Sequence, residues 1–567
     1  MRVIPVLLAI LSSFATAEIL APERRTIWTP GISGGIPEIA GPVRSVLDHG
    51  ADPTGAKDNK AAFDAALAAL PSSGGVVLVP KGKYRFASTW LVRRNNVVVR
   101  GEGHAKSELL FDHASDGIQI RPSGSDGTAQ AVSGFAKGSR TVTVTDGSVF
   151  QAGDFVKIDQ KNDSAKMYTD PTWNETWAAD AVGQVFEVAS VSGNKLTFKS
   201  AIHYPIRSDL SPRIRKIAVV RGVGFEALKV ARLQKGTHSL TFKSSAYCWV
   251  RRVESWYGHR THIQVSGGIG FEARENFVHR SFSYGNGGQG YGIELGWQAT
   301  DALVENNVFD SLRHAMMVHV GVVGSVFGYN HAERNLQGEG ETNLNSGWIP
   351  PDISIHGHWA QMNLFEGNSV QEIGISDYWG PMGPGNTYAR NVVRGEGIFL
   401  YDHSDDQNLV GNVSTKWTDD GTSKGTLRHG EKVGSSTTWA SGIADRAIPA
   451  SYYLASRPAW WTGSLAWPSM GSDVASSKNP AELRFDAGAP IPAAAPVSVR
   501  RILEAPAGFV IDARLVAPDG RVVRSWTRAI RSMEALRDLR GLPAGTYLFV
   551  GWDGVRPESR RAEVTSR

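Results

Sequence analysis

The sequence predicts an all-β chain whose main body is a parallel β-helix. Two observations support this: asparagines recur at a coil-like spacing in the second half of the chain, and a short helix precedes the first run of strands. With 62 glycines, 20% charged and 41% hydrophobic residues, the composition is that of a folded chain rich in turns. The recurring asparagines are Asn276, Asn307, Asn330, Asn368, Asn391 and Asn412.

The gaps between these asparagines are 31, 23, 38, 23 and 21 residues. A coil of roughly 22 residues, with loops that lengthen some turns, explains these gaps. Each coil needs the same sharp turn. A side-chain amide tolerates left-handed geometry there and can hydrogen-bond to the coils above and below. We therefore expect a stacked asparagine ladder with a structural role.

The chain begins with a positive residue and a short apolar run, which small residues follow at Ala15, Thr16 and Ala17. This pattern predicts a signal peptide that is cleaved before Glu18. A membrane anchor is the alternative, but the run is shorter than the about 20 residues that span a bilayer. We expect a secreted or periplasmic protein with no membrane span.

A capping helix is expected before the first coils. Phe63, Ala66, Leu67 and Leu70 are spaced to form one apolar face of a short helix, which Pro71 and two glycines end. The side chain of Asp58 is placed to accept hydrogen bonds from the free amides at the start of this helix.

The run GADPTGAKDNKAAFDAALAALPSSGGVVLVPKGKYRF, with VVVRGEG after it, resembles the N-terminal cap and first coils of the pectate-lyase-like superfamily. That superfamily has rhamnogalacturonase-like and epimerase-like members. The resemblance covers residues 43 to about 120, and it implies a right-handed parallel β-helix with an N-terminal capping helix. It carries no catalytic residue. A second segment, DISIHGHWAQMNLFEGN with DYWGPMGPGNTYARN, resembles other β-helix proteins of this superfamily and implies the same architecture for residues 300–415.

Alternating apolar and polar residues predict a small β-insertion before the asparagine repeats and a β-sandwich-like module at the C-terminus. A Pro/Ala-rich stretch between the repeats and this module is typical of a linker. The predicted parts are 1–17 signal peptide, 18–42 N-terminal arm, 43–120 cap and first coils, 121–215 β-insertion, 216–485 catalytic or binding β-helix domain, 486–496 linker, and 497–567 C-terminal module.

The net charge of +5 and the isoelectric point near 9.1 slightly favour an acidic polymer as partner. We expect a polysaccharide partner and no nucleic acid, and the sequence does not define the oligomeric state. Cys248 is the only cysteine, so no internal disulfide forms. It lies in an apolar strand-like run, which predicts a buried structural thiol.

The densest cluster of polar residues lies between Asp310 and Asp406. Counted from the preceding ladder asparagine, His319 lies at offset 12, and Asp377 and Tyr401 lie at 9 and 10. Equal offsets on stacked coils lie about 4.8 Å apart, so these residues are expected along one edge. The candidate catalytic residues are Arg313, His314, His319, His356, His358, Asp377, Tyr378, Tyr401 and Asp402. The candidate substrate-binding residues are Trp359, Trp379, His403, Trp173 and Trp177.

The favoured interpretation is a polysaccharide lyase that cleaves a uronate-containing polymer by β-elimination. A histidine of the cluster would remove the proton next to the carboxylate, Arg313 would neutralise that carboxylate, and Tyr378 or Tyr401 would protonate the leaving oxygen. Asp405 and Asp406 are candidate ligands for Ca²⁺, the one cofactor considered.

Two alternatives remain open. A glycoside hydrolase would use Asp377 and Asp402 as its paired carboxylates. Asp405 and Asp406 resemble the paired aspartates of polygalacturonase-like β-helices, although the accompanying Asn-Thr-Asp and Arg-Ile-Lys motifs are absent. A non-catalytic glycan-binding β-helix is the second alternative.

Overall fold

The computed structural model describes residues 19–285, 287–338, 350–461 and 463–492, together with the backbones of four strands of the C-terminal module. The predicted signal peptide lies outside these residues. The chain divides into two compact units, Met1–Ile491 and Pro492–Arg567, and the boundary falls within the segment predicted as a linker.

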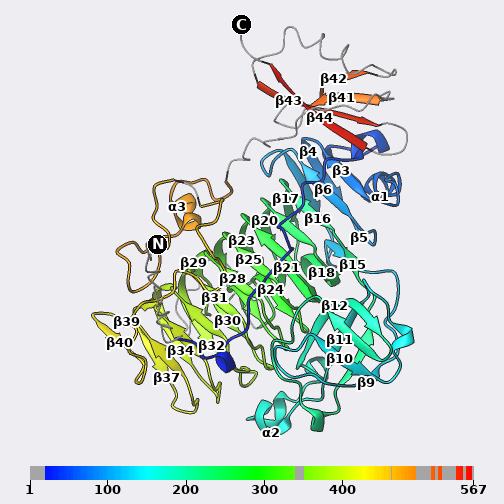
Figure 1. Cartoon of the computed structure of the whole chain (residues 1–567). Helices are drawn as coiled ribbons and strands as arrows, with labels where there is room; N and C mark the ends of the chain where they lie inside the picture. The colour runs from blue at the N-terminus through cyan, green and yellow to red at the C-terminus, as the bar shows by residue number, and fades with distance from the viewer. Residues whose placement is uncertain are drawn as a thin grey trace, which may run out of the picture. The chain divides into compact units, whose positions relative to one another are not determined.

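The first unit is the predicted right-handed parallel β-helix (Figure 1). Strands of successive coils pair in parallel, and together they form three faces. The first face contains β1 (Val43–Ser45), β3 (Gly75–Val79), β6 (Val97–Gly101), β16 (Gly224–Glu226), β19 (Trp249–Arg251), β22 (Glu272–Arg274), β25 (Leu303–Glu305), β28 (Val326–Gly328), β31 (Leu364–Glu366), β33 (Thr387–Ala389), β35 (Asn408–Val410) and β38 (Leu427–His429).

The second face contains β2 (Thr54–Asp58), β4 (Gly82–Phe86), β7 (Ser107–Phe111), β17 (Lys229–Arg232), β20 (Glu254–Gly258), β23 (Phe277–Ser281), β26 (Val308–Leu312), β29 (His331–Asn335), the first parts of β32 (Ser369–Ile375) and β34 (Val392–Leu400), β36 (Val413–Ser414) and β39 (Glu431–Val433). The third face contains β5 (Trp90–Val92), β8 (Ile118–Ile120), β18 (His238–Ala246), β21 (Thr261–Ile269), β24 (Tyr291–Gly296), β27 (His314–Val318), β30 (Ile353–Ile355), the second parts of β32 and β34, and β37 (Trp417–Asp419). The short strand β15 (Val220–Arg221) pairs with the end of β18.

Inward side chains form columns that run through the coils. On the third face, Ile293, Met316, Ile353, Ile373 and Ile398 pair in succession, and each is at most 1% exposed. Burying such a side chain contributes about 1.5–3 kcal/mol. Because this column fixes which residue of each strand points inward, it also fixes which residues point outward.

The asparagine ladder is confirmed. Asn276 donates to Asn307 over 2.9 Å, and Asn307 donates to Asn330 over 3.0 Å. The series continues through the other three members and ends on the carboxyl of Glu431. Each of these amides is fully or almost fully buried.

The left-handed residue of the turn, however, is not the asparagine. The residue before it adopts φ between 55° and 69°, and these residues are Glu275, Asn306, Tyr329, Gly367, Arg390 and Gly411. The prediction that the asparagine itself adopts the left-handed conformation was therefore wrong by one position. The preceding residue makes the bend, and its side chain is left at the turn surface while the asparagine binds its neighbours inside.

A second ladder, which the sequence did not reveal, lies in the turn between the third and first faces. The amide N–H of Ser325 donates to Asn363, Asn363 donates to Asn386 over 3.0 Å, and Asn386 donates to Gln407 over 3.3 Å. Because its members belong to three residue types, no repeat of one residue marks it in the sequence.

The capping helix is α1 (Lys60–Ala68), where Phe63 packs edge-on against Tyr84, Phe86 and Trp90. Its N-cap residue is Asn59 rather than the predicted Asp58. The Asp58 carboxylate accepts from the amides of Lys60 and Ala87, so it ties the start of the helix to the next strand.

The β-insertion is a closed antiparallel barrel with its own core, which includes Val156 and Phe186. Its strands are β9 (Gln130–Ser133), β10 (Thr141–Val144), β11 (Phe155–Asp159), β12 (Gly183–Ser192), β13 (Lys195–Phe198) and β14 (Arg213–Lys216). The loop between β11 and β12 contains α2 (Ser164–Met167) and two 3-10 turns, η4 (Pro171–Trp173) and η5 (Thr176–Ala178). The other 3-10 turns are η1 (Pro22–Arg24), η2 (Val46–His49), η3 (Gly147–Val149) and η6 (Ser208–Leu210).

The N-terminal arm runs along the β-helix against the direction of the coils (Figure 1). Arg24 donates to Asn408 over 2.7 Å, Trp28 donates to the carbonyl of Met362 over 2.8 Å, and the carbonyl of Ile39 accepts from Arg100. The arm therefore contacts late coils first and early coils last.

At the last coil, the short strand β40 (Ser436–Thr438) pairs antiparallel with β39. The following residues run back over several coils, where Tyr453 donates to Glu305 over 2.7 Å. The helix α3 (Pro480–Asp486) continues this path, and its N-cap Asn479 donates to the carbonyl of Asn330 over 2.9 Å.

The described part of the C-terminal unit is one antiparallel sheet in the order β42 (Val522–Trp526), β41 (Asp512–Val516), β43 (Gly545–Trp552) and β44 (Pro557–Val564). Its sandwich-like second layer stays a prediction. Among the described residues, no helix is long and apolar enough to cross a membrane.

The ladder predicts a test of stability. Asn330→Ala removes the donor to Asn368 and to the carbonyl of Val304 and the acceptor for Asn307. Leaving these buried groups unpaired is expected to lower the free energy of unfolding by about 3 kcal/mol or more in a urea titration. The exposed Asn174→Ala is the control, with an expected change below about 0.5 kcal/mol. Equal stability of the two variants would contradict a structural role for the ladder.

Candidate active site

A cleft of about 930 Å³ opens on the outer side of the third face. Strands β24 and β27, the residues that follow β27, β30, β32 and β34, and the loop of the β-insertion all line it. Nine of the residues proposed from the sequence line this cleft: Arg313, His314, His319, His356, Asp377, Tyr378, Trp379, Tyr401 and Trp177.

Strand register explains why residues so far apart in the sequence converge. His319, His356 and Tyr401 each directly follow a strand of the third face. Their backbone amides continue the ladder by donating to the carbonyls of Leu295, Val318 and Ile375. The offsets from the asparagine ladder are unequal because the turns differ in length, so the predicted edge is right while the counted offsets are only approximate.

His356 and Asp377 form an acid–histidine pair within the cleft. The Nδ1 atom of His356 hydrogen-bonds to the carboxylate of Asp377, whose other oxygen accepts from the amide of Trp379 over 3.2 Å. Burial alone would raise the pKa of Asp377, but the charge and hydrogen bond of His356 outweigh it and hold the pKa below its usual value. The carboxylate therefore stays ionised, fixes Nδ1 as the protonated nitrogen of neutral His356, and leaves Nε2 as a base.

A second acid–histidine pair joins His319 to Glu294 over 3.0 Å. The sequence analysis did not select Glu294. Its carboxylate also accepts from Thr261 and Gln264. Burial opposes its ionisation, yet His319 and these neighbours hold the pKa of Glu294 well below its usual value. The ionised Glu294 carboxylate orients the ring of His319 through Nε2.

His314 has a different environment from the other two histidines. Its Nδ1 donates to the carbonyl of Pro351 over 2.7 Å, and its ring lies 6.3 Å from that of His356. Burial, together with the positive charge of Arg313, lowers the pKa of His314 to about 3. His314 is therefore neutral at physiological pH, and its Nε2 can accept a hydrogen bond.

The tyrosines and Arg313 complete the polar lining. Arg313 donates to the carbonyl of Tyr284 over 2.8 Å. Burial and the nearby Glu372 raise the pKa of Tyr401, so its hydroxyl keeps its proton at neutral pH. Burial raises the pKa of Tyr291, another cleft residue, to about 12. Tyr378 is 68% exposed, which leaves its ring open to a ligand.

The β-insertion forms one wall of the cleft. The carbonyl of Trp177 accepts from Trp297 over 3.0 Å, and the ring of Trp177 lies edge-on to those of His358 and Trp379. Thr169 donates to Asp402, which follows β34, over 2.7 Å. The insertion loop therefore bridges successive coils along the cleft.

Three predicted residues support this wall and do not line the cleft. His358 is buried and donates through Nε2 to the carbonyl of Trp173 over 3.0 Å, and burial lowers its pKa to about 4. The ring of Trp173 packs against Tyr378, 6.2 Å away. Trp359 packs with the insertion against Met167. In the structure these three side chains pack into the wall, and their roles in catalysis and substrate binding stay predictions.

Four predicted acidic and histidine residues lie outside the cleft, in the turn after β34. Asp402 binds Thr169, His403 is exposed, the carboxylate of Asp405 accepts from the amide of Lys424 over 2.7 Å, and Asp406 pairs with Arg24. Asp402 does not line the cleft, although its carboxyl is near enough to Asp377 for their charges to interact. Within the described residues, no group of three or more His, Cys, Asp or Glu is arranged to hold a metal.

The sequence analysis missed several lining residues, among them Glu294, Tyr291, Trp297, Arg260 and Phe399. One signal could have found Glu294. It is the single charged residue in the apolar run 291–296, one coil before His314. A charge within a strand whose residues are all buried needs a partner, and His319 is that partner.

The outer face of this parallel β-helix carries a cleft lined by indole rings, histidines, arginines and carboxylates. These are features of a carbohydrate-active protein. Residues 43–317 match the family described as rhamnogalacturonase A/epimerase, pectate lyase-like. This match confirms, over residues 43–317, the resemblance to the pectate-lyase-like superfamily. It ends before His319, so it does not cover His356, Asp377 or Tyr401. No curated protein sequence matches the chain.

Several solved structures are similar to the chain at low identity and with TM-scores below 0.5. The tailspike protein gp49 from Pseudomonas phage LKA1 is 17% identical (TM-score 0.48, 66% of this chain and 64% of that chain). The Gp54 tailspike of Acinetobacter baumannii bacteriophage AP22, solved with a capsular saccharide, is 15% identical (TM-score 0.42, 65% and 58%). The mannuronan C-5 epimerase AlgE6 A-module of Azotobacter vinelandii is 14% identical (TM-score 0.31, 69% and 98%). The chain spans less than two thirds of both tailspikes, and none of these similarities defines its activity.

The environment of His314 predicts its titration. Nitrogen NMR of histidine-labelled protein is expected to show His314 neutral and protonated on Nδ1 at pH 5, because burial lowers its pKa to about 3. Histidine in a model peptide, with a pKa of about 6.5, is charged at that pH and serves as the control. A cationic His314 at pH 5 would contradict the assignment.

Proposed function

We propose that this protein is an exported polysaccharide lyase that cleaves a uronate-containing polymer by β-elimination. The observation that carries the proposal is the His356–Asp377 pair in a cleft that also holds Arg313, a second acid–histidine pair and proton-bearing tyrosines. An ionised carboxylate behind a histidine increases its basicity and fixes its tautomer, which is the arrangement of a general base.

In the proposed reaction, Nε2 of His356 takes the proton from the carbon next to the uronate carboxylate. The electron pair of that C–H bond forms the new carbon–carbon double bond, and the bond to the glycosidic oxygen breaks. Tyr401 donates its proton to the departing oxygen, and its raised pKa ensures that it carries this proton at neutral pH. Exchange with solvent then returns His356 and Tyr401 to their starting states.

The negative charge that develops on the carboxylate needs cationic partners. Arg313 offers planar guanidinium donors, and His319, held by Glu294, lies in the same cleft. Neutral His314 would accept a hydrogen bond from a sugar hydroxyl. The three histidines have different partners: Asp377 for His356, Glu294 for His319 and the carbonyl of Pro351 for His314.

A glycoside hydrolase is less well supported. Such an enzyme needs a carboxylic acid that keeps its proton, usually with a raised pKa. The two carboxylates that line the cleft, Glu294 and Asp377, both have lowered pKa values because each has a histidine partner. Neither is suited to donate a proton at neutral pH. A hydrolase would therefore rely on Asp402, which lies outside the cleft lining and whose pKa is raised by burial, as the acid beside ionised Asp377.

Calcium stays a prediction from the sequence. The carboxylates of Asp405 and Asp406 are already used by Lys424 and Arg24, and they lie outside the cleft. This donor set does not fit an ion that acts on substrate, so no step of the proposed reaction involves Ca²⁺.

Export is proposed from the charge and apolar pattern of residues 1–17. N-terminal sequencing of protein recovered from the periplasm or medium is expected to begin at Glu18. An intact Met1 on the exported protein would contradict cleavage.

The activity is tested on a panel of polyuronates and neutral glycans by absorbance near 235 nm, where the unsaturated product absorbs. His356→Ala is expected to lower kcat by about 10²–10⁴-fold, since it removes the general base. Asp377→Asn is expected to cause a smaller loss, because the tautomer of His356 is no longer fixed by a charge. Repeating the assay with EDTA and with added Ca²⁺ tests the calcium prediction.

The matched control is His403→Ala, which changes an exposed histidine outside the cleft and is expected to keep full activity. New reducing ends without absorbance would identify a hydrolase. Binding without any product would identify a glycan-binding protein. Either result would overturn the lyase proposal.

A further inference from the structure

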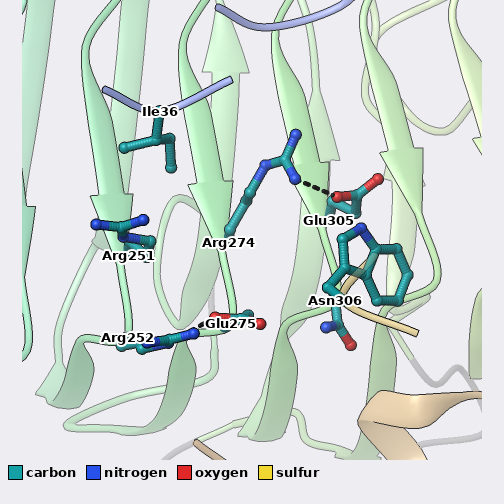
Figure 2. A pocket seen from close by; sticks show the side chains of 8 residues that line it. Ile36, Arg251, Arg252, Arg274, Glu275, Glu305 and Asn306 are labelled. Atoms are coloured by element: carbon teal, nitrogen blue, oxygen red, sulfur yellow. Dashed lines mark hydrogen bonds and ion pairs between the residues drawn. The ribbon is translucent and has the colours of Figure 1, made fainter. Parts of the chain in front are cut away.

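A second pocket, of about 200 Å³, lies at the turn between the first and second faces, away from the cleft on the third face (Figure 2). Three segments that are distant in the sequence meet there. The coils supply Arg252, Glu275 and Asn306, the N-terminal arm supplies Ile36, and the segment after the last coil supplies Trp460.

The polar wall of this pocket follows from the turn geometry of the coils. Arg252, Glu275 and Asn306 occupy the left-handed turn position on three successive coils, directly before the ladder position. Because this position lies at the surface of the turn, the three side chains form a row, as Figure 2 shows. Neighbouring members of the row are spaced by the distance between strands, about 4.8 Å.

Some hydrogen-bonding groups of this wall are already used. Nε of Arg252 pairs with Glu275 over 2.6 Å, and the carbonyl-type oxygen of the Asn306 side chain accepts from Arg484 over 2.9 Å. Others are not: among the described residues, no partner is found for the two terminal nitrogens of Arg252, for Oε1 of Glu275 or for Nδ2 of Asn306. The wall thus offers both donors and an acceptor within a short distance.

Each arginine of the wall already has a carboxylate partner. Arg252 pairs with Glu275, Arg274 pairs with Glu305 over 2.8 Å, and Arg251 pairs with Glu226 and Glu38 beyond the lining. A pocket whose arginines are all paired does not favour a free anion. Sugar hydroxyls each donate and accept, so neighbouring hydroxyls on a ring match a wall of mixed donors and acceptors.

Trp460 supplies the apolar part of the pocket. Its ring is held by Tyr329 and Trp461, with centroids 5.7 and 5.6 Å away. A fixed indole beside a row of planar polar groups provides a surface for the C–H face of a sugar. The volume is below the roughly 300–1,000 Å³ of sites for drug-sized ligands, which limits the occupant to about one ring.

We propose that this pocket binds one neutral pyranose residue of a glycan, independently of the cleft. It would hold the polymer on a different side of the coil from the proposed catalytic residues. The proposal does not depend on the lyase assignment, because it rests on other residues.

Saturation-transfer NMR of the full chain with methyl glycosides of glucose, galactose, mannose and rhamnose, and with methyl glucuronide, tests the proposal. At least one neutral glycoside is expected to receive saturation. Trp460→Ala and Arg252→Leu are each expected to reduce that signal at least fivefold. Trp460→Phe keeps an aromatic face and is expected to retain most of it.

Trp177→Ala is the matched control, since it removes an indole from the cleft and is expected to leave this signal unchanged. Thermal unfolding of each variant checks that it folds. If Trp460→Ala does not fold, the test relies on Arg252→Leu and Trp460→Phe. The proposal is overturned if no neutral glycoside receives saturation, if only the glucuronide does, or if the signal is lost in Trp177→Ala and kept in Arg252→Leu.

Discussion

The parallel pairing of strands from coil to coil is the constraint on which the rest of this structure depends. A column such as Met316, Ile353 and Ile373 is buried only in one register, because a shift by one residue would turn the apolar side chains outward. That register also aligns the amides of the asparagine ladder. The same alignment brings His319, His356 and Tyr401 to one edge, although they are separated by up to 82 positions in the sequence.

The fold could be predicted because its two strongest signals are local or periodic. The cap around Phe63 is a continuous stretch of sequence, and the ladder repeats one residue type whose buried amide cannot be replaced without leaving its partners unpaired. The left-handed turn residue could not be predicted, since arginine, glutamate, asparagine and tyrosine all occupy it. What the coils share there is a backbone conformation, which does not require a particular side chain.

The candidate site was predicted in its location and only partly in its members. Counting from the ladder found the edge, but it assumes turns of equal length. The register shift between β32 and β34 and the long connection before β30 break that assumption, so Asp402 was included and Glu294 was missed. Sequence alone also did not show that the β-insertion packs against the same edge, because the contacts of Thr169 and Trp177 join parts of the chain more than 100 residues apart.

The course of the N-terminal arm has a consequence for how the molecule reaches its final form. The arm precedes every coil in the chain, yet Arg24 binds Asn408 and Gln407, which belong to one of the last coils. These contacts cannot exist until almost the whole β-helix has wound. A chain that has formed only its early coils therefore leaves Trp28 and its neighbours without the surface that buries them. Docking of the arm therefore marks completion of the fold, and an unfinished molecule differs from a finished one in having an undocked N-terminal arm with Trp28 exposed.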